Sequence, residues 1–135
     1  MSAPTSYLAD IDAVDCRALL ATGKVGRIVF TRRALPESRP VGYAWDRGRI
    51  VFAVDDVAVA RAIVGNAVAA FETDGFDDVS ARAWTVLAVG ETFELAAAEA
   101  VRLRPRLHGP WTGGPTAAAL ALRPARLTGL VVRPC

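Results

Sequence analysis

Histidine and cysteine are nearly absent from this sequence, which has one histidine, His108, and two cysteines, Cys16 and Cys135, in 135 residues. A catalytic triad needs a nucleophile beside a base, and no G-x-S-x-G segment surrounds any serine. A zinc site of the usual kind needs about three or four histidine or cysteine ligands. The sequence therefore predicts no triad and no metal site, and His108 stays a candidate acid–base group. We expect any enzymatic chemistry to come from a bound cofactor.

Lysine is also scarce, because Lys24 is the only one against 15 arginines, and the net charge is only +2. No basic cluster alternates with aromatic residues, which argues against a nucleic-acid partner. No apolar run approaches the ~20 residues of a membrane-spanning helix. Residues 1–8 lack the basic and apolar regions of a signal peptide. We therefore expect a cytoplasmic protein with neither nucleic acid nor membrane as a partner.

Phosphate-binding and carboxylate motifs are likewise missing. Neither a Walker A motif nor G-x-G-x-x-G occurs, and Gly113-Gly114 is predicted to be a turn. Asp74, Asp77 and Asp78 offer carboxylates, but no histidine or glutamate at helical spacing joins them. This pattern favours a solvated acidic hairpin tip over a metal site.

Apolar residues are abundant, at 53% of a chain that has the length of one domain. Such a surplus indicates a second burial surface, so we predict a homodimer. Residues 1–9 are expected to form a flexible tail. Capping residues and apolar periodicity predict helices over Asp12–Thr22, Val57–Val64 and Ala96–Leu103. β-Branched and aromatic runs predict strands over Lys24–Thr31, Arg39–Trp45, Arg49–Val54, Ala67–Thr73, Ser80–Leu95, Thr116–Leu122 and Arg126–Val132.

The order of these elements decides the fold class. Strands and helices do not alternate as they do in a doubly wound parallel sheet. We therefore predict a mainly β fold with flanking helices, in which one domain over residues 1–135 forms a closed or nearly closed antiparallel barrel.

Several side chains have two open interpretations. Trp84, just after the acidic loop, is either a ligand neighbour or a packing anchor of the core or dimer. Trp111, in a loop rich in proline and glycine, is either a lid over a cavity or a dimer contact. Arg27 lies on an otherwise apolar strand face, and so it faces either a ligand or an interfacial carboxylate.

Two other sets are expected to have structural roles. Tyr43 is predicted to lie on a strand face with its hydroxyl hydrogen-bonded. Arg102, Arg104 and Arg106 are predicted to form a solvated helix end.

Five segments carry a family resemblance. They read D-C-R-A-L-L-A-T-G-K-V-G-R-I-V-F (Asp15–Phe30), R-P-V-G-Y-A-W-D-R-G-R-I-V-F (Arg39–Phe52), A-F-E-T-D (Ala70–Asp74), W-T-V-L-A-V-G (Trp84–Gly90) and L-R-P-A-R-L-T-G (Leu122–Gly129). Together and in this order, they resemble the pyridoxamine 5′-phosphate oxidase-like family of flavin-binding split-barrel proteins, in particular its short actinobacterial members.

The resemblance implies a six-stranded antiparallel split β-barrel that forms a homodimer. It implies FMN, or the deazaflavin F420, bound in grooves between the subunits, and an oxidoreductase that transfers hydride to or from a small molecule. Trp84 would reach the flavin from the partner chain. The cofactor-binding residues that it implies are Arg27, Ile28, Val29, Pro40, Val41, Tyr43, Val54, Asp55, Arg61, Trp84 and Trp111.

One segment departs from the family pattern. Members usually have a hydroxyl residue and a lysine after the third barrel strand, where the phosphate binds. Here the segment reads A-V-D-D-V-A-V-A-R, with Asp55 and Asp56 at that place, and Arg61, Arg27 and Arg82 are the candidate substitute cations. The start of the following helix offers backbone N–H groups to an anion, and the two aspartates are placed to cap those groups first. Carboxylates repel phosphate. An alternative function is therefore a non-catalytic split-barrel dimer that has lost the flavin phosphate site and serves as a binding or interaction module.

Overall fold

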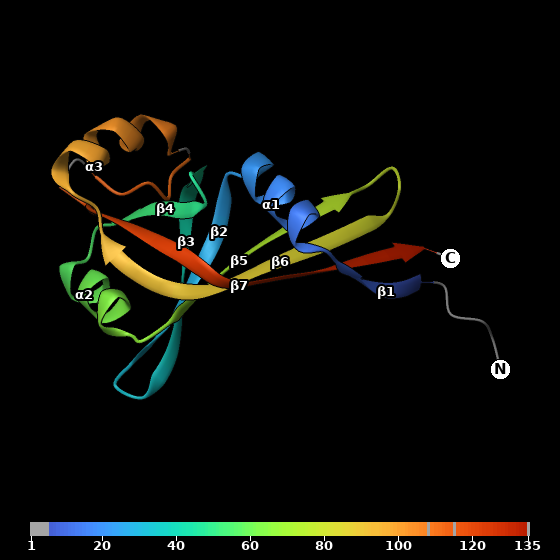
Figure 1. The fold of residues 1–135 in the computed structure, drawn as a ribbon, viewed down its shortest axis with the longest axis horizontal. Helices are drawn as coiled ribbons and strands as arrows, with labels where there is room; N and C mark the ends of the chain where they lie inside the picture. Colours follow the sequence, from blue (N-terminus) through green and yellow to red (C-terminus); the bar gives the residue numbers. More distant parts are fainter. Residues whose placement is uncertain (1–5, 108, 115, 135) are drawn as a thin grey trace.

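A seven-stranded antiparallel sheet dominates the computed structural model, which describes residues 6–107, 109–114 and 116–134 (Figure 1). The elements follow in the order β1 (Ser6–Ile11), α1 (Ala13–Thr22), β2 (Val25–Arg32), β3 (Leu35–Asp46), β4 (Arg49–Val54), α2 (Val57–Gly65), β5 (Ala69–Asp77), β6 (Arg82–Glu94), α3 (Ala97–Leu103), the short 3₁₀ helix η1 (Arg104–Arg106) and β7 (Ala118–Pro134).

Six of the strands close on themselves. The strand order is β1-β7-β4-β3-β2-β5-β6, and β6 pairs in addition with β7, so β2 to β7 form a complete antiparallel circuit. The mainly β antiparallel barrel predicted from the sequence is thereby confirmed. Figure 1 shows α2 and α3 at one end of the molecule, while the β5–β6 hairpin, β1 and the end of β7 extend toward the other.

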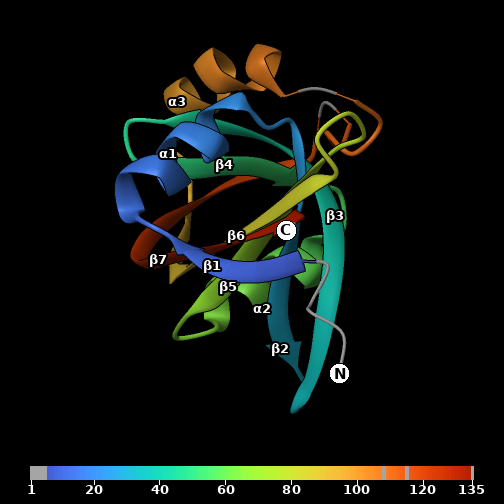
Figure 2. The same ribbon diagram turned by 90° about the vertical axis from the view of Figure 1, so that its right-hand side faces the viewer.

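The N-terminal region differs from the prediction of a flexible tail over residues 1–9. Residues 6–11 form β1, which pairs with β7 from Ser6 opposite Pro134 to Ile11 opposite Gly129 (Figure 2). The tail prediction is therefore wrong from residue 6 onward, because β1 gains its hydrogen bonds from a strand at the far end of the sequence. Residues 1–5 lie outside the described residues, as do His108 and Cys135.

β7 also differs from the prediction, which placed one strand before Arg123-Pro124 and another after it. A single strand runs through both, and it is long enough to pair with β4, β6 and β1. The register against β6 shifts between Val89 and Gly90, at the point where Gly90 pairs with Pro124. A bulge absorbs the proline, which lacks the N–H that a regular ladder requires.

The main core fills the barrel, with Ile28, Tyr43, Phe52 and Phe71 among its fully buried side chains. β4 is buried on both faces, because Val51 packs outward in a second cluster with residues that include Leu103 of α3. This explains why β4 is an unbroken apolar run with no alternation of polar residues. α3 and the segment after it thus cover the outer side of the barrel next to β4.

Candidate functional site

A small cleft of about 220 Å³ brings together five of the eleven residues predicted to bind a cofactor: Pro40, Val41, Val54, Asp55 and Trp111. β3 and the end of β4 supply its floor, the start of α2 one wall, and the loop over residues 109–114 another. The remaining lining residues are Arg39, Ala53, Asp56, Val59, Pro110 and Gly113.

Two hydrogen bonds hold the 109–114 loop against the barrel. The Gly42 N–H donates to the Trp111 carbonyl oxygen at 2.8 Å, and the Gly114 N–H donates to Asp55 Oδ1 at 2.7 Å. Gly113 has φ +71°, a conformation that favours glycine, and a Cβ there would lie 2.6 Å from Ala117 Cβ. The loop therefore follows a defined path that leaves the Trp111 side chain 49% exposed at the cleft.

The start of α2, beside the cleft, is capped by its own sequence. Asp56 Oδ1 accepts hydrogen bonds from the Ala58 N–H at 2.9 Å and the Val59 N–H at 3.2 Å. Asp56 thus satisfies donors that the first turn of a helix leaves free. Neither Asp55 nor Asp56 points an unpaired carboxylate into the cleft.

Arg39 is the cation of the cleft, and the sequence did not single it out. Its side chain is 46% exposed, and its Nη2 lies 3.8 Å from Glu37 Oε2. With Asp55 and Asp56, it gives the lining side chains a net charge of −1. The available signal was its position directly before Pro40 on the strand predicted to line the groove.

The other predicted residues lie away from the cleft. Arg27 is on the outer face of β2, where its Nη2 contacts Asp74 at 2.8 Å and Glu72 at 3.2 Å, and these hydrogen bonds raise its pKa. Val29 lies two residues further along the same strand and is half-buried, whereas Ile28 is fully buried in the core. Within one chain, these three residues do not join the cleft.

Tyr43 is a core residue. Its ring packs edge-on against Phe71, and its hydroxyl donates to the Leu20 carbonyl oxygen at 2.8 Å. Burial raises the pKa of Tyr43 to about 12. Gly23, which ends α1, makes room for this hydroxyl, because a Cβ there would lie 2.1 Å from it. We therefore leave Tyr43 and Ile28 out of the site that we propose below.

Trp84 does not line the cleft and lines instead an apolar hollow beside β1, β5, β6 and β7. It stands on β6 directly opposite Gly75 of β5, where a Cβ would come within 2.3 Å of the indole ring. It is partly buried against the main core. Trp84 therefore does not contribute to the cleft of its own chain. Its predicted role as a flavin neighbour would require a partner chain.

Arg102 and Arg106, predicted to form a solvated helix end, are 41% and 48% exposed, but they also make ion pairs that the sequence did not indicate. Both pair with the buried Asp46, at 3.0 and 2.9 Å, and Arg49 joins them at 2.9 Å. Hydrogen bonds, first from Arg102 and then from Arg49, hold the pKa of Asp46 well below its usual range although burial opposes them. The cluster fastens α3 and η1 to the β3–β4 turn, directly before the loop that carries Trp111.

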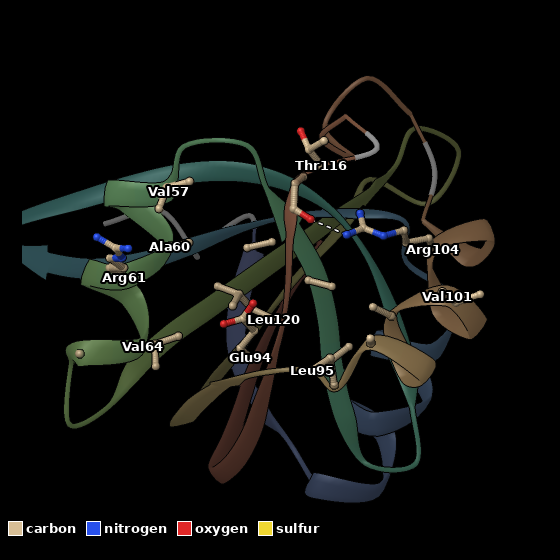
Figure 3. A pocket seen from close by; sticks show the side chains of 16 residues that line it. Val57, Ala60, Arg61, Val64, Glu94, Leu95, Val101, Arg104, Thr116 and Leu120 are labelled. Atoms are coloured by element: carbon tan, nitrogen blue, oxygen red, sulfur yellow. Dashed lines mark hydrogen bonds between the residues drawn. The ribbon is translucent and has the colours of Figure 1, made fainter.

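A larger cavity of about 830 Å³ lies between α2 and α3 (Figure 3). Alanine and valine side chains form most of its walls, and the Arg104 guanidinium donates to the Ala117 carbonyl oxygen at its edge. Arg61 is the one predicted residue that lines it, and Figure 3 shows Arg61 on the side of α2 farther from α3. The cleft, which joins five predicted residues, remains the candidate site.

An apolar hollow of about 530 Å³ opens on the outer side of the sheet, where β1, β5, β6 and β7 run together. Phe76 and Leu8 are 67% and 62% exposed there. We call this surface the apolar face and define it by Leu8, Phe76, Ala83, Leu130 and Val132.

Two features are absent from the described residues. None of the helices is both long and apolar enough to cross a membrane. Likewise, residues 6–107, 109–114 and 116–134 contain no group of three or more His, Cys, Asp or Glu side chains placed to hold a metal ion.

Comparison with known proteins places the chain in a family. An uncharacterized protein of Mycobacterium tuberculosis is 32% identical over 126 residues, which cover 90% of this chain and 83% of the relative. The fold is similar to that of the FAD-binding protein of Mycobacterium smegmatis (TM-score 0.72, 21% identity, 92% of this chain and 97% of that one). It is also similar to that of an FAD-binding protein of Mesorhizobium loti (TM-score 0.76, 15% identity, 92% and 97%). The model of the pyridoxamine 5′-phosphate oxidase family matches residues 12–131, so this chain belongs to that family.

Proposed function

We propose that this protein is a homodimeric flavin-dependent oxidoreductase whose flavin ring lies in the cleft beside Trp111. Membership of the pyridoxamine 5′-phosphate oxidase family supports a flavin, and two solved relatives are FAD-binding proteins. The observation that carries the proposal is the cleft itself, where Pro40, Val41, Val54 and Trp111 form apolar walls. Apolar and aromatic walls with a few polar groups are typical of cofactor sites.

The residues of the cleft fit a flavin ring. The half-exposed Trp111 indole offers an aromatic surface, and β3 and β4 offer aliphatic ones. Arg39 would donate hydrogen bonds to polar atoms of the ring. When bound, the flavin supplies the hydride transfer. The chain's own residues bind and orient the ring, and the Asp55–Gly114 hydrogen bond fixes the loop that shields it from water.

A second copy of the chain would complete the site. The cleft volume of about 220 Å³ is below the roughly 300–1,000 Å³ of ordinary cofactor sites. We propose that the partner subunit supplies the missing wall and that the partner's Trp84 belongs to it.

The apolar face supports the homodimer. Exposed apolar patches of this kind mark interaction surfaces in proteins of one domain. A partner chain would cover these exposed apolar side chains.

The test is the visible absorption spectrum of the purified protein, followed by titration with FMN, FAD and F420. We expect a flavin band or binding of at least one of these. Trp111→Ala should weaken flavin binding by about tenfold, because an aromatic contact contributes about 0.5–1.5 kcal/mol. Leu35→Ala, at an exposed tip of the β2–β3 hairpin, is the control. A colourless protein that binds none of the three flavins would refute the proposal.

A non-catalytic split-barrel dimer is the second candidate. The observation that favours it is the α2 start, where Asp56 occupies backbone donors and Asp55 holds the loop. This candidate predicts that the cleft takes up no flavin in any titration. A flavin that stays bound through purification would exclude it.

A further inference from the structure

Asp55 and Asp56 are adjacent acidic residues whose carboxylates both bind backbone N–H groups at the cleft. We infer that these two residues determine ligand specificity, because they keep a terminal phosphate away from the start of α2. The cleft then takes a flavin by its ring and gains nothing from a phosphate monoester. The inference rests on the proposed function for its ligand, and its first test does not require a flavin.

The backbone N–H groups at the start of α2 already have partners within the chain. A helix leaves the N–H groups of its first turn without intrahelical partners, and such groups bind anions. In α2, which has nine residues, the Ala58 and Val59 N–H groups donate to Asp56 Oδ1. The Gly114 N–H, on the loop across the cleft, donates to Asp55. The chain's own carboxylates thus stand where an external anion would have to bind.

The net charge of the side chains that line the cleft also disfavours a phosphate. Apolar Val57, Ala58 and Val59 make up the first turn of α2, so this turn has no hydroxyl or cationic side chain for a phosphate. Arg39 is the one cationic side chain of the lining and its printed ionic partner is Glu37, so the lining has a net charge of −1. A phosphate monoester, which is negatively charged at neutral pH, is repelled by such a lining. A neutral ring system is not.

The start of α1 can be compared with the start of α2, because an aspartate caps both helices. Asp12 caps α1 as Asp56 caps α2, through the Asp15 N–H at 2.8 Å, and it does not line the cleft. Capping alone therefore accounts for an aspartate at a helix start. Asp55 is different, because it bonds to a loop 59 residues away and lies beside a cleft. Of these two helix starts, the one at α2 combines a capping aspartate with a position at the cleft.

The first experiment titrates inorganic phosphate at pH 7 and follows the amide resonances of Ala58, Val59 and Gly114 by NMR. We expect no saturable shift in the wild type. The double variant Asp55→Asn/Asp56→Gly should gain saturable shifts at the Ala58 and Val59 amides. Glycine at an N-cap frees the donors and costs only a few tenths of a kcal/mol. Asparagine keeps an oxygen for the loop N–H.

The matched control is Asp12→Gly, which frees the start of α1 and should leave all three amides unchanged. Should the double variant fail to fold, Asp56→Gly alone serves, since it leaves the Asp55–Gly114 bond in place. Saturable phosphate shifts in the wild type would overturn the inference. So would a folded variant whose amides do not respond.

The second experiment compares riboflavin with FMN, which differ only in the terminal phosphate. We expect wild-type dissociation constants within threefold of each other and a preference of at least tenfold for FMN in the double variant. A wild type that prefers FMN tenfold would overturn the inference. If neither flavin binds, the proposed function fails, and the phosphate titration still decides the inference.

Discussion

Asp46 shows how one side chain can hold together parts of the chain that are distant in sequence. It is 7% exposed and binds Arg49, Arg102 and Arg106. Arg106 also donates to the Trp45 carbonyl oxygen at 2.8 Å. The loop that carries Trp111 begins directly after Arg106, so Asp46 fixes one end of the segment that shapes the cleft.

Asp46→Asn should lower the free energy of unfolding at pH 7 by about 2 kcal/mol, because a hydrogen bond to a charged group contributes about 1.5–3 kcal/mol and two of the arginines are partly exposed. The pKa of Asp46 is lowered in the folded state. Its contribution is therefore fully present above the unfolded pKa of about 3.9 and is lost as the pH falls below that value.

Urea denaturation between pH 7 and pH 3 measures both effects. The difference between wild type and Asp46→Asn should shrink toward the acid end. Asp78→Asn, at the exposed tip of the β5–β6 hairpin, is the control and should leave the unfolding curve unchanged. An Asp46→Asn protein as stable as the wild type at pH 7 would contradict this role.

The sequence did not single out Asp46. Its partners Arg102 and Arg106 lie 56 and 60 residues further along the chain, and no local pattern connects them. Asp55 and Asp56 were easier to interpret, because capping is a local property and the prediction that they would cap the donors of α2 is confirmed for Asp56. The sequence did not indicate that Tyr43 is buried, because a tyrosine on a strand can face either the core or the solvent.

At the scale of elements, the strands with clear alternation were predicted well. β2 has Gly26, Ile28 and Phe30 buried and their neighbours outside, as the alternation indicated. β1 was missed because its six residues show no clear alternation and its hydrogen bonds depend on β7. The alternation of apolar and polar residues thus predicts strands that pack against a core. It does not predict strands that only extend the edge of a sheet.

Gly26 of β2 lies close to Phe71 and Glu72 of β5. A Cβ at this position would lie 2.2 Å from Phe71 Cζ and 2.8 Å from the Glu72 carbonyl oxygen. Gly26→Ala should therefore destabilise the protein by about 1–3 kcal/mol, the usual cost of overpacking a core. Thermal or urea unfolding measures this cost.

Gly65, the last residue of α2, is the matched control, since a Cβ there would have no atom within 4 Å. Gly65→Ala should leave the stability unchanged or raise it by up to about 1 kcal/mol, because alanine favours the helix. Equal stability of the two variants would show that the β2–β5 contact is looser than the structure indicates.

At the scale of the whole molecule, part of the apolar surplus of the sequence is gathered on one surface. The apolar face leaves Leu8, Phe76, Leu130 and Val132 at least 37% exposed. The composition predicted a second burial surface but gave no indication of its position. That position follows from the pairing of β1 and β6 with β7, which places side chains from both ends of the sequence on one face.

Phe76→Asp should convert the proposed dimer to a monomer, because a carboxylate buried in an apolar interface without a partner is strongly unfavourable. Size-exclusion chromatography with light scattering over a range of concentrations measures the oligomeric state. Val79→Asp adds the same charge to the same hairpin at a side chain that is 97% exposed outside the apolar face, and it should leave the dimer intact.

If the partner supplies a wall of the cleft, flavin binding should fall together with dimerisation in Phe76→Asp and persist in Val79→Asp. A Phe76→Asp protein that remains dimeric would place the interface on another surface, and a monomer that binds flavin at full affinity would show that one chain completes the site.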